Sequence, residues 1–349
     1  MESKNTDEHF MRRALQLAGL GGVFVAPNPK VGAVIVCDGK IIGEGYHQKY
    51  GEAHAEINAI NSVQNKELIP TSIIYVTLEP CSHYGKTPPC ADAIVQLKFK
   101  RVVIGCVDSF SKVCGRGIER IRKAGIAVKV GVLEKEARLI NKRFFTFHEK
   151  KRPYVILKWA QTQDGYIDRL PENRQKGVNW ITQPETKILV HKWRSEEQVI
   201  LVGANTIIND NPSLTVREIN GKNPIRVILD PDNIIATPSA IFQDDVKTFI
   251  FNNSPKKTEF LGNHIEFITI QDFSISSILK ELYNLGFLSI FVEGGAFTLN
   301  KFIEANCWDE ARVLKGNTYF EHGISAPEIN AQRVQSHFGK DEITYYFNT

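Results

Sequence analysis

Two stretches indicate the fold and chemistry of this chain most clearly. They are Thr77-Leu78-Glu79-Pro80-Cys81-Ser82-His83-Tyr84-Gly85-Lys86-Thr87-Pro88-Pro89-Cys90 and the shorter His54-Ala55-Glu56 that precedes it. One imidazole, from His54, and two thiolates, from Cys81 and Cys90, form a ligand set that holds Zn²⁺ and leaves its fourth position for water. The metal lowers the pKa of that water to about 7, so that hydroxide is available at neutral pH. We expect Glu56 to carry the proton from the attacking water to the departing amine without binding the metal.

A histidine, a glutamate two residues later and two cysteines after a proline are typical of zinc-dependent nucleobase deaminases. We expect His54 and Glu56 to begin a helix, Cys81 to follow a strand at a helix start, and Cys90 to begin the next helix. Eight residues separate the two cysteines, whereas the usual deaminase signature has two. The alternative is a coincidental histidine with two structural cysteines, but that leaves the coincidence of ligands, base and flanking elements unexplained.

Length and composition restrict the class of protein. A chain of 349 residues predicts two domains. It contains no apolar run long enough to cross a membrane, and its first residues lack the apolar region of a signal peptide. Six cysteines do not form a disulfide framework, so we expect a cytoplasmic protein. The net charge of +4 suits an anionic small molecule and is too small to predict a nucleic-acid partner.

The charged segment Phe147-His148-Glu149-Lys150-Lys151-Arg152-Pro153 predicts a linker between domains at residues 1–148 and 153–349. Before it, strands are expected at residues 31–37, 72–78, 101–107 and 127–130, and helices at 8–20, 54–63, 90–97 and 117–124. This alternation predicts an α/β sandwich with a largely parallel sheet. After it, strands are expected at residues 154–159, 198–203, 225–230, 246–251, 265–269 and 289–293, and helices at 185–194, 275–285 and 298–305. The second half is therefore a second α/β domain.

Four segments together resemble the deaminase domain of the bifunctional riboflavin-biosynthesis deaminase/reductase family. They are the run from Thr77 to Cys90, Pro27-Asn28-Pro29-Lys30-Val31-Gly32-Ala33, Tyr50-Gly51-Glu52-Ala53-His54-Ala55-Glu56 and Gly115-Arg116-Gly117-Ile118. The long segment between the cysteines separates this family from cytidine and tRNA deaminases. The resemblance implies a cytidine-deaminase-like three-layer α/β/α fold for the first domain.

The resemblance also implies a phosphorylated pyrimidine substrate, 2,5-diamino-6-ribosylamino-4(3H)-pyrimidinone 5′-phosphate, which loses its 2-amino group as ammonia. The residues that match the family's substrate contacts are Asn28, His47, His83, Lys86 and Asp108. An amide such as Asn28 can pair with a ring edge, and His83 and Lys86 can meet the ribose and phosphate. The alternative for each is an ordinary surface polar residue. Asp108-Ser109-Phe110 departs from the family's Asp-Pro-Asn, so Phe110 is not assigned a role.

The second half resembles the family's reductase, which has a dihydrofolate-reductase-like α/β fold. The matching segments are Lys158 to Gly165, Trp180-Ile181-Thr182, Gly203 to Thr206, Asp210 to Arg217 and Glu293 to Ala296. No G-x-G-x-x-G fingerprint is present. Gly294-Gly295 between an apolar strand and a helix would let a phosphate approach the helix N-terminus, although such turns also occur for packing alone.

This resemblance implies that NADPH reduces the opened ribose to a ribityl chain at C1′. The residues that match NADPH contacts are Ala160, Trp180, Thr206, Asp210, Gly295, Ala296, Phe297, Thr298, Leu299, Asn300 and Lys301, and those that match substrate contacts are Lys158, Arg194, Leu214, Arg217 and Glu293. The two arginines suit a phosphate. As a catalytic residue Lys158 would polarise or protonate the reacting sugar oxygen, the alternative being a solvated lysine at a strand end. The family also implies a homo-oligomer, a dimer or tetramer.

Three departures leave open a deaminase with an inactive reductase domain. Val178-Asn179-Trp180 replaces Ser-x-Trp, the loop at residues 168–177 is long and charged, and Asp230-Pro231-Asp232 replaces Asp-Ser. Two other classes of protein do not agree with the sequence. A nucleic-acid-editing deaminase predicts a short cysteine spacing and a basic face with stacking aromatics. A non-catalytic relative predicts a lost metal ligand or a lost glutamate.

Overall fold

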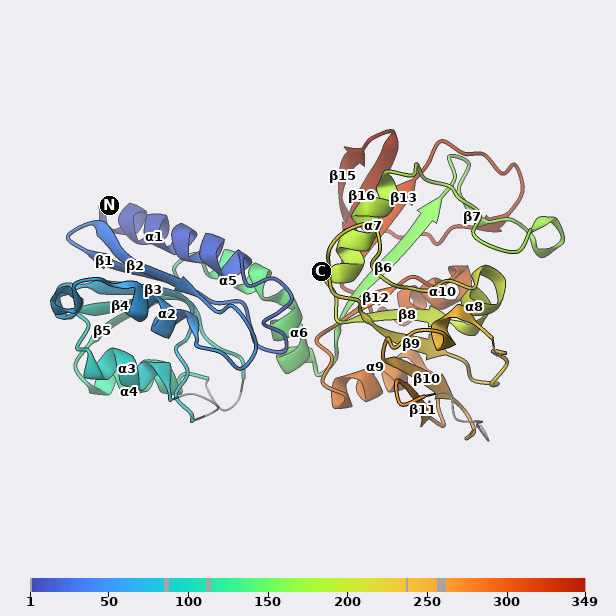
Figure 1. Cartoon of the computed structure of the whole chain (residues 1–349). Coiled ribbons are helices and arrows are strands. Elements are labelled where there is room, and N and C mark those ends of the chain that lie inside the picture. Colours follow the sequence, from blue (N-terminus) through green and yellow to red (C-terminus); the bar gives the residue numbers. More distant parts are fainter. Residues whose placement is uncertain (1, 85–87, 111–113, 237, 256–261, 349) are drawn as a thin grey trace. The chain divides into compact units, whose positions relative to one another are not determined.

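A computed structural model describes residues 2–84, 88–110, 114–236, 238–255 and 262–348, with side chains from Thr6 onward. The chain forms two compact units, Met1–Lys151 and Arg152–Thr349 (Figure 1). The segment predicted to be a linker is helical up to residue 150, because α6 (Lys142–Lys150) runs into it and is anchored by the buried Phe144 and Phe145. The linker prediction is therefore wrong for residues 147–150.

The first unit has a five-stranded sheet in the order β2-β1-β3-β4-β5. Its strands are β1 (Gly32–Cys37), β2 (Lys40–Tyr46), β3 (Ile73–Leu78), β4 (Arg101–Cys106) and β5 (Ala127–Val130). Its helices are α1 (Glu2–Gly19), α2 (Ala55–Ser62), the 3₁₀ helix η1 (Lys66–Thr71), α3 (Cys90–Gln96), α4 (Arg116–Lys123), α5 (Glu134–Ile140) and α6.

The sheet of the first unit is mixed, so the prediction of a largely parallel sheet is wrong on one side. β3, β4 and β5 are parallel, but β1 is antiparallel to both of its neighbours. The turn Asp38-Gly39, with φ of 48° and 75°, joins β1 directly to β2. Strands joined by so short a turn must run antiparallel.

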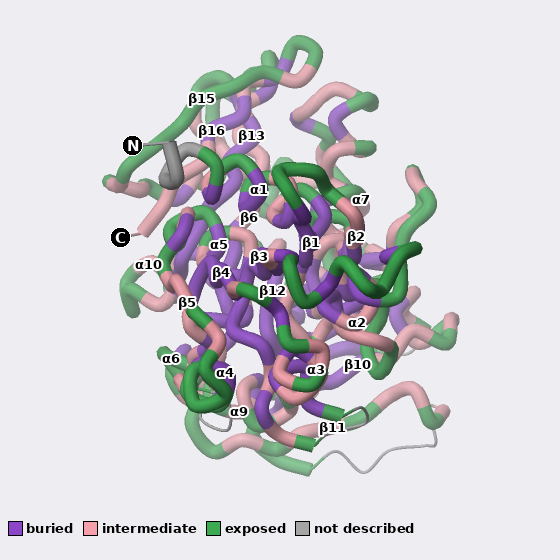
Figure 2. Tube along the Cα trace, turned by 90° about the vertical axis from the view of Figure 1, so that its left-hand side faces the viewer, coloured by how far each residue is buried: buried purple, intermediate pink, exposed green. Residues whose placement is uncertain are grey.

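Alternating side chains give this sheet a core on each face, as strand geometry requires. Ala33 and Ile35 of β1 pack toward α2, α3 and α4, whereas Val34 and Val36 pack toward α1. Figure 1 shows α1 and α5 on one side of the sheet and α2, α3 and α4 on the opposite side. In Figure 2 the strands β1, β3 and β4 are mostly purple, the colour of buried residues. The expected three-layer α/β/α arrangement is confirmed.

The second unit has a nine-stranded sheet in the order β11-β10-β9-β8-β12-β6-β13-β16-β15, and β7 pairs separately with β14. Its strands are β6 (Tyr154–Gln161), β7 (Tyr166–Asp168), β8 (Val199–Gly203), β9 (Ile225–Leu229), β10 (Thr248–Asn252), β11 (Ile265–Thr269), β12 (Ser289–Val292), β13 (Glu310–Lys315), β14 (Ile324–Ser325), β15 (Gln332–Phe338) and β16 (Asp341–Phe347). Its helices are α7 (Thr186–Ser195), α8 (Ala204–Asp210), α9 (Ile275–Asn284), α10 (Ala296–Glu304) and the 3₁₀ helices η2 (Pro171–Asn173) and η3 (Ala240–Phe242).

Helices cover both faces of the nine-stranded sheet. The strands that lie between β11 and β13 in the sheet are all parallel. Their side chains form one apolar core with α9 and α10, a second with α8 and a third with α7. The strands β13 to β16 were not expected from the sequence. β13 carries the buried pair Glu310 and Arg312, whose Oε1 and Nε lie 2.7 Å apart, in place of an apolar pattern. β15 is an edge strand exposed along nearly its whole length.

Among the described helices, none combines the length and the apolar composition that crossing a membrane requires.

A buried carboxylate fixes α1 to the sheet of the first unit. Asp7, 2% exposed, accepts hydrogen bonds from Arg101 Nη2 at 2.8 Å and Lys129 Nζ at 2.7 Å. Tyr75 donates its hydroxyl to the same carboxylate at 3.1 Å. Burial opposes ionisation of Asp7, but the hydrogen bonds from Arg101 and Lys129 outweigh it and lower its pKa. The ionised form therefore ties α1 to β3, β4 and β5.

We expect Asp7→Asn to weaken the docking of α1 by about 2 kcal/mol, because two cations lose their shared partner. The folded-state pKa of Asp7 lies below its unfolded value of about 3.9, so this stabilisation is complete above that value and is lost as the pH falls through the folded-state pKa. Hydrogen exchange of α1 amides, measured between pH 7 and pH 3, checks both points. Asp92→Asn, which breaks the exposed pair with Arg120, is the control and should change exchange by far less. Equal protection of wild type and Asp7→Asn at pH 7 would contradict the prediction.

Candidate active sites

The three predicted metal ligands lie together in the first unit. His54 caps the N-terminus of α2, Cys90 is the first residue of α3, and Cys81 lies in the loop after β3. His54 Nδ1 is 3.5 Å from Cys81 Sγ and 3.4 Å from Cys90 Sγ, and all three ligand atoms lie within 4.8 Å of one another. With Zn–S and Zn–N distances of about 2.3 and 2.1 Å, tetrahedral coordination separates nitrogen and sulfur ligands by about 3.6 Å. Geometry and donor set therefore both fit Zn²⁺.

Cys81 does not begin a helix, contrary to the sequence prediction, because the chain continues as a loop after it. Its sulfur nevertheless meets a helix N-terminus, since the backbone N–H of Cys90 donates to Cys81 Sγ at 3.2 Å. Hydrogen bonds from Cys90 and from His54 lower the pKa of Cys81. The thiolate needed for a zinc ligand is thus favoured by α3 rather than by a helix of its own.

Glu56 lies in the first turn of α2, two residues after the histidine ligand, and is only 3% exposed. Burial raises its pKa to about 7. A carboxyl group with such a pKa can take up and release a proton near neutral pH, as a general acid and base must.

Asn28 and His47 form a hydrogen-bonded pair beside the metal ligands. His47 Nδ1 lies 3.1 Å from the carbonyl oxygen of Ala53, which can only accept a hydrogen bond, so Nδ1 carries the proton. The unprotonated Nε2 then accepts from Asn28 Nδ2 at 3.1 Å. Burial lowers the pKa of His47, which agrees with a neutral ring. The arrangement fixes the orientation of the Asn28 amide, while the His47 ring lies 5.3 Å from the His54 ring.

The remaining predicted contacts of this site lie after β3 and β4. His83 Nδ1 is enclosed and has no hydrogen-bond partner among the described residues, and its ring lies 6.1 Å from that of Phe110. Asp108 is buried, burial raises its pKa to about 6, and its Oδ1 accepts the backbone N–H of Phe110 at 2.7 Å. Lys86 lies outside the described residues.

Glu79 organises the loop around this site, a role that the sequence analysis missed. Its buried carboxylate accepts the backbone N–H groups of Gly115 and Gly117, each at 2.9 Å, and that of Asp108 at 3.3 Å. It therefore holds the N-terminus of α4 and the backbone of Asp108 together. A Cβ at Gly117 would lie 2.0 Å from the Pro80 carbonyl oxygen, so only glycine allows this approach. Gly115 supplies the left-handed φ of 77°.

In the second unit, a cavity of about 490 Å³ is lined by all five residues predicted to bind the reductase substrate and by four of those predicted to bind NADPH. These residues are Lys158, Arg194, Leu214, Arg217 and Glu293, and Ala160, Trp180, Thr206 and Asp210. The exposed Val178, where the family carries serine, also lines the cavity.

A buried ion-pair cluster lies at the carboxyl end of β12, beside the middle of β6. Because Leu157 is paired with Val292, the next residues, Lys158 and Glu293, are neighbours, and Lys158 Nζ lies 3.4 Å from Glu293 Oε2. Arg194 of α7 donates to Glu293 from Nε at 2.6 Å and from Nη2 at 2.9 Å. Burial opposes ionisation, yet Arg194 and Lys158 hold the pKa of Glu293 at about 2. Arg194 is therefore paired with Glu293, and its contact with a substrate phosphate stays a prediction.

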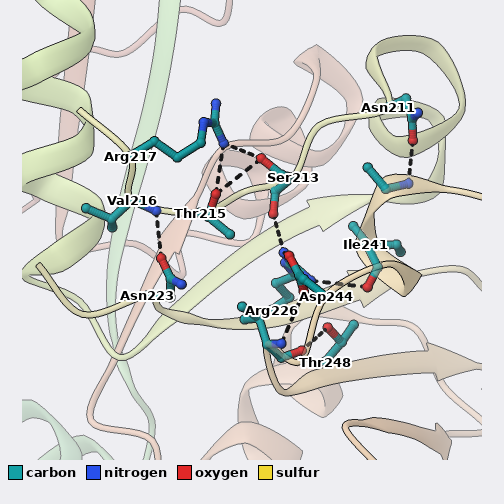
Figure 3. A network of polar contacts seen from close by, with 12 residues as sticks. Asn211, Ser213, Thr215, Val216, Arg217, Asn223, Arg226, Ile241, Asp244 and Thr248 are labelled. Atoms are coloured by element: carbon teal, nitrogen blue, oxygen red, sulfur yellow. Dashed lines mark hydrogen bonds and ion pairs between the residues drawn. The ribbon is translucent and has the colours of Figure 1, made fainter. Parts of the chain in front are cut away.

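The loop that carries Leu214 and Arg217 is fixed from below by a buried arginine, Arg226 of β9 (Figure 3). Arg226 donates to the Ser213 carbonyl oxygen at 2.5 Å, to the Ile241 carbonyl oxygen at 3.1 Å and to both carboxylate oxygens of Asp244. Above it, Arg217 Nη1 donates to the hydroxyls of Ser213 and Thr215. Ser213 therefore connects the two arginines, because its carbonyl oxygen accepts from the buried Arg226 and its hydroxyl accepts from Arg217 at the cavity.

Arg174, from the long charged loop, also lines the cavity. It pairs with Asp168 at 2.7 Å from Nε and with Asp210 from Nη2. Asn179 Nδ2 donates to Asp168 at 2.8 Å, so its amide nitrogen is engaged as well. The predicted NADPH contact Asp210 is therefore an ion pair in this chain.

The predicted cofactor run at residues 295–301 forms the start of α10. A Cβ at Gly294 would lie 2.7 Å from Thr298 Cβ, so Gly294 serves packing, whereas a Cβ at Gly295 would meet nothing within 4 Å. This open space beside a helix N-terminus suits a dinucleotide phosphate. Leu299 is fully buried in the core and its N–H donates to the Gly295 carbonyl, and its contact with the cofactor stays a prediction. Phe297 is 78% exposed, and Ala296, Asn300 and Lys301 belong to the same helix.

Sequence reasoning therefore missed four organising residues: Glu79, Arg174, Arg226 and His191, whose Nδ1 accepts the backbone N–H of Arg217 at 2.9 Å. Signals for them existed. Arg226 is an arginine inside the apolar run Ile225-Arg226-Val227-Ile228-Leu229, and His191 precedes Arg194 by three residues, which places both on one helix face.

Known protein families match both units of the chain. The family profile for the RibD C-terminal domain matches residues 153–316, and that for the cytidine and deoxycytidylate deaminase zinc-binding region matches residues 4–106. Riboflavin biosynthesis protein RibD of Aquifex aeolicus is 38% identical over 336 residues, 95% of this chain and 93% of its own length. The Escherichia coli protein of the same name is 35% identical and covers 88% of this chain, matched over 86% of its own length.

Two solved structures are similar over 99% of both chains. One is a diaminohydroxyphosphoribosylaminopyrimidine deaminase/5-amino-6-(5-phosphoribosylamino)uracil reductase from Thermotoga maritima, with 36% identity and a TM-score of 0.87. The other is Acinetobacter baumannii RibD, with 28% identity and a TM-score of 0.88.

We expect Glu79→Gln to lower the deamination expected of the first unit by about 10- to 100-fold, equivalent to losing one or two charge-assisted hydrogen bonds. A glutamine amide nitrogen cannot accept an N–H, so the loop at Asp108 and Gly115 loosens while the zinc ligands are untouched. Ammonia release and zinc content per chain are the measurements. The exposed Glu119→Gln is the control. Loss of zinc together with activity, or full activity, would contradict this account.

Proposed function

Since this chain belongs to the riboflavin biosynthesis protein RibD family and is a bifunctional deaminase and reductase, we propose that its two units act in sequence on one phosphorylated pyrimidine. The proposed substrate is 2,5-diamino-6-ribosylamino-4(3H)-pyrimidinone 5′-phosphate, in line with the name of the Thermotoga maritima relative. The first unit removes its 2-amino group, and the second reduces the ribosyl chain to ribityl with NADPH. The observation that carries the proposal is that each unit contains its own set of reactive groups, His54, Cys81, Cys90 and Glu56 in one and Lys158 with Glu293 in the other.

In the deaminase site, His54, Cys81 and Cys90 hold zinc, and the chemistry that zinc supplies when bound is the acidification of water toward a pKa of about 7. Glu56 accepts the proton from water and delivers it to the departing amine. The buried position of Glu56 excludes bulk water from this exchange. Asn28, oriented by His47, offers a carbonyl oxygen and an N–H to the pyrimidine edge, and His83 and Asp108 complete the binding site.

In the reductase site, NADPH supplies the hydride. Lys158 lies beside Glu293, whose carboxylate is 3.4 Å from Nζ and directs it. We assign to Lys158 Nζ the proton or hydrogen bond that the sugar oxygen needs as hydride arrives at C1′. Arg194 holds Glu293 in place, and Arg217 faces the phosphate. Trp180, Thr206, Asp210 and the start of α10 bind the cofactor.

No observation favours an inactive reductase. Val178 removes one hydroxyl from the cavity, but the ion-pair cluster and the loop that carries Arg217 are intact. Asp230, in the replaced Asp-Ser position, builds a turn by accepting the N–H groups of Ile234 and Ile235.

The proposal extends to location and assembly. All six cysteines are unpaired, which favours the cytoplasm. A homo-oligomer, dimer or tetramer, is supported by the family and by the open, exposed edge of the nine-stranded sheet at β15, and sedimentation equilibrium measures it directly.

Glu56→Gln should reduce ammonia release by about 10³-fold, since the proton carrier is lost and the metal ligands remain. Ammonia release, zinc content and NADPH oxidation are to be measured separately. Reduction should be normal when the variant is given deaminated substrate. Glu67→Gln, exposed on η1, serves as the matched control. Substantial ammonia release by Glu56→Gln would sink the proposed role.

Lys158→Met should abolish NADPH oxidation with deaminated substrate while ammonia release stays at the wild-type rate. The methionine keeps the length of the side chain and removes the charge. The control is Lys192→Met, which removes an exposed lysine of α7 outside the cavity and should leave both reactions unchanged. If Lys158→Met still reduces the substrate at a comparable rate, the ammonium group is not the required donor.

A further inference from the structure

His191 lies in the wall of the reductase cavity, although nothing in the proposed reaction yet uses it. It is only 5% exposed. Lys187, Val190 and Arg194 of α7 also line the cavity, at the spacing that places them with His191 on one face of the helix.

The hydrogen bonding of His191 defines its tautomer. The backbone N–H of Arg217 donates to His191 Nδ1 at 2.9 Å, and a backbone N–H can only be a donor. A neutral imidazole that accepts at Nδ1 carries its hydrogen on Nε2. Burial, with the nearby charges of Arg194 and Arg217, lowers the pKa of His191 to about 4, so the ring is neutral under physiological conditions.

The Nε2–H of His191 has no hydrogen-bond partner within the described ranges of the chain. It is also not one of the fully enclosed unpartnered atoms of that part of the structure. The donor is therefore accessible, and because the residue lines the cavity, a molecule in the cavity can reach it. An accessible N–H that faces a cavity is suited to a ligand that supplies an acceptor.

The neighbouring charge indicates which kind of acceptor fits. Arg194 is paired with the Glu293 carboxylate. Arg217, by contrast, reaches only the hydroxyls of Ser213 and Thr215 with its guanidinium, and no carboxylate pairs with it among the described residues. This end of the cavity therefore offers a cation, the Ser213 hydroxyl and the imidazole N–H, a combination that suits a phosphate group.

We propose that His191 is a substrate-binding residue of the reductase site, whose Nε2–H donates to the phosphate of the pyrimidine substrate while its Nδ1 fixes the backbone of Arg217. The inference rests on the proposed function and extends it to a residue and an atom. A neutral imidazole gives a donor of fixed direction, which complements the charge of Arg217.

Two amide variants separate the functions of the two nitrogens. In His191→Asn, the amide oxygen can replace Nδ1 as acceptor for Arg217, but nothing replaces the Nε2–H. In His191→Gln, the longer side chain places an N–H near the Nε2 position. Calorimetric titration with 5-amino-6-(5-phosphoribosylamino)uracil, with its dephosphorylated form and with NADPH gives affinities without turnover. Circular dichroism and thermal melting confirm folding, and the exposed His322→Asn is the control.

We expect His191→Asn to bind the phosphorylated substrate about 10- to 100-fold more weakly and to raise its KM with little change in kcat. His191→Gln should retain affinity within about fivefold. The dephosphorylated compound and NADPH should bind both variants as they bind wild type.

Three outcomes would overturn the inference: wild-type affinity in His191→Asn, an equal loss for the dephosphorylated compound, or a loss confined to NADPH, whose own phosphates would then be the acceptors. Wild-type protein that neither binds nor reduces the phosphorylated compound contradicts the proposed function itself. Normal wild-type binding with an unaffected His191→Asn contradicts the assignment of His191 alone.

Discussion

Parallel pairing of neighbouring strands brings the reactive side chains of each unit to one edge of its sheet. Leu78 is paired with Cys106, so the residues that follow β3 and β4, including the cysteine ligand and Asp108, leave the sheet side by side. In the second unit the register of Val292 with Leu157 makes neighbours of Glu293 and Lys158. Sites beyond the carboxyl ends of parallel strands follow from this geometry.

Buried charged groups then fix the irregular segments that strand pairing cannot control. Glu79 gathers the N–H groups of the loop before α4, and Asp341 of β16 accepts from Gln183 N and from Thr186 Oγ1 at the start of α7. Arg226 does the reverse and donates to loop carbonyls. Each group exchanges hydration for several directed hydrogen bonds, which hold the loops in place.

The sequence predicted the groups whose chemistry demands a particular residue type. His54, Cys81 and Cys90 were recognisable because zinc accepts few ligands, and the central strands because they are continuously apolar. Residues whose role depends on contacts with distant segments of the chain could not be recognised from the sequence. His191 resembles any helix histidine until the chain brings the N–H of Arg217 to it from 26 positions away. β13 and β15 failed to show strand patterns because one buries an ion pair and the other is exposed on both faces.

The buried guanidinium of Arg226 also constrains how descendants of this chain can change. Its charge is matched by Asp244, and its two terminal nitrogens also donate to the carbonyls of Ser213 and Ile241, so that it joins three segments. Replacing the arginine alone strands a carboxylate and two carbonyls, and replacing Asp244 alone strands a cation in the core. We therefore expect Arg226 and Asp244 to tolerate replacement only as a pair.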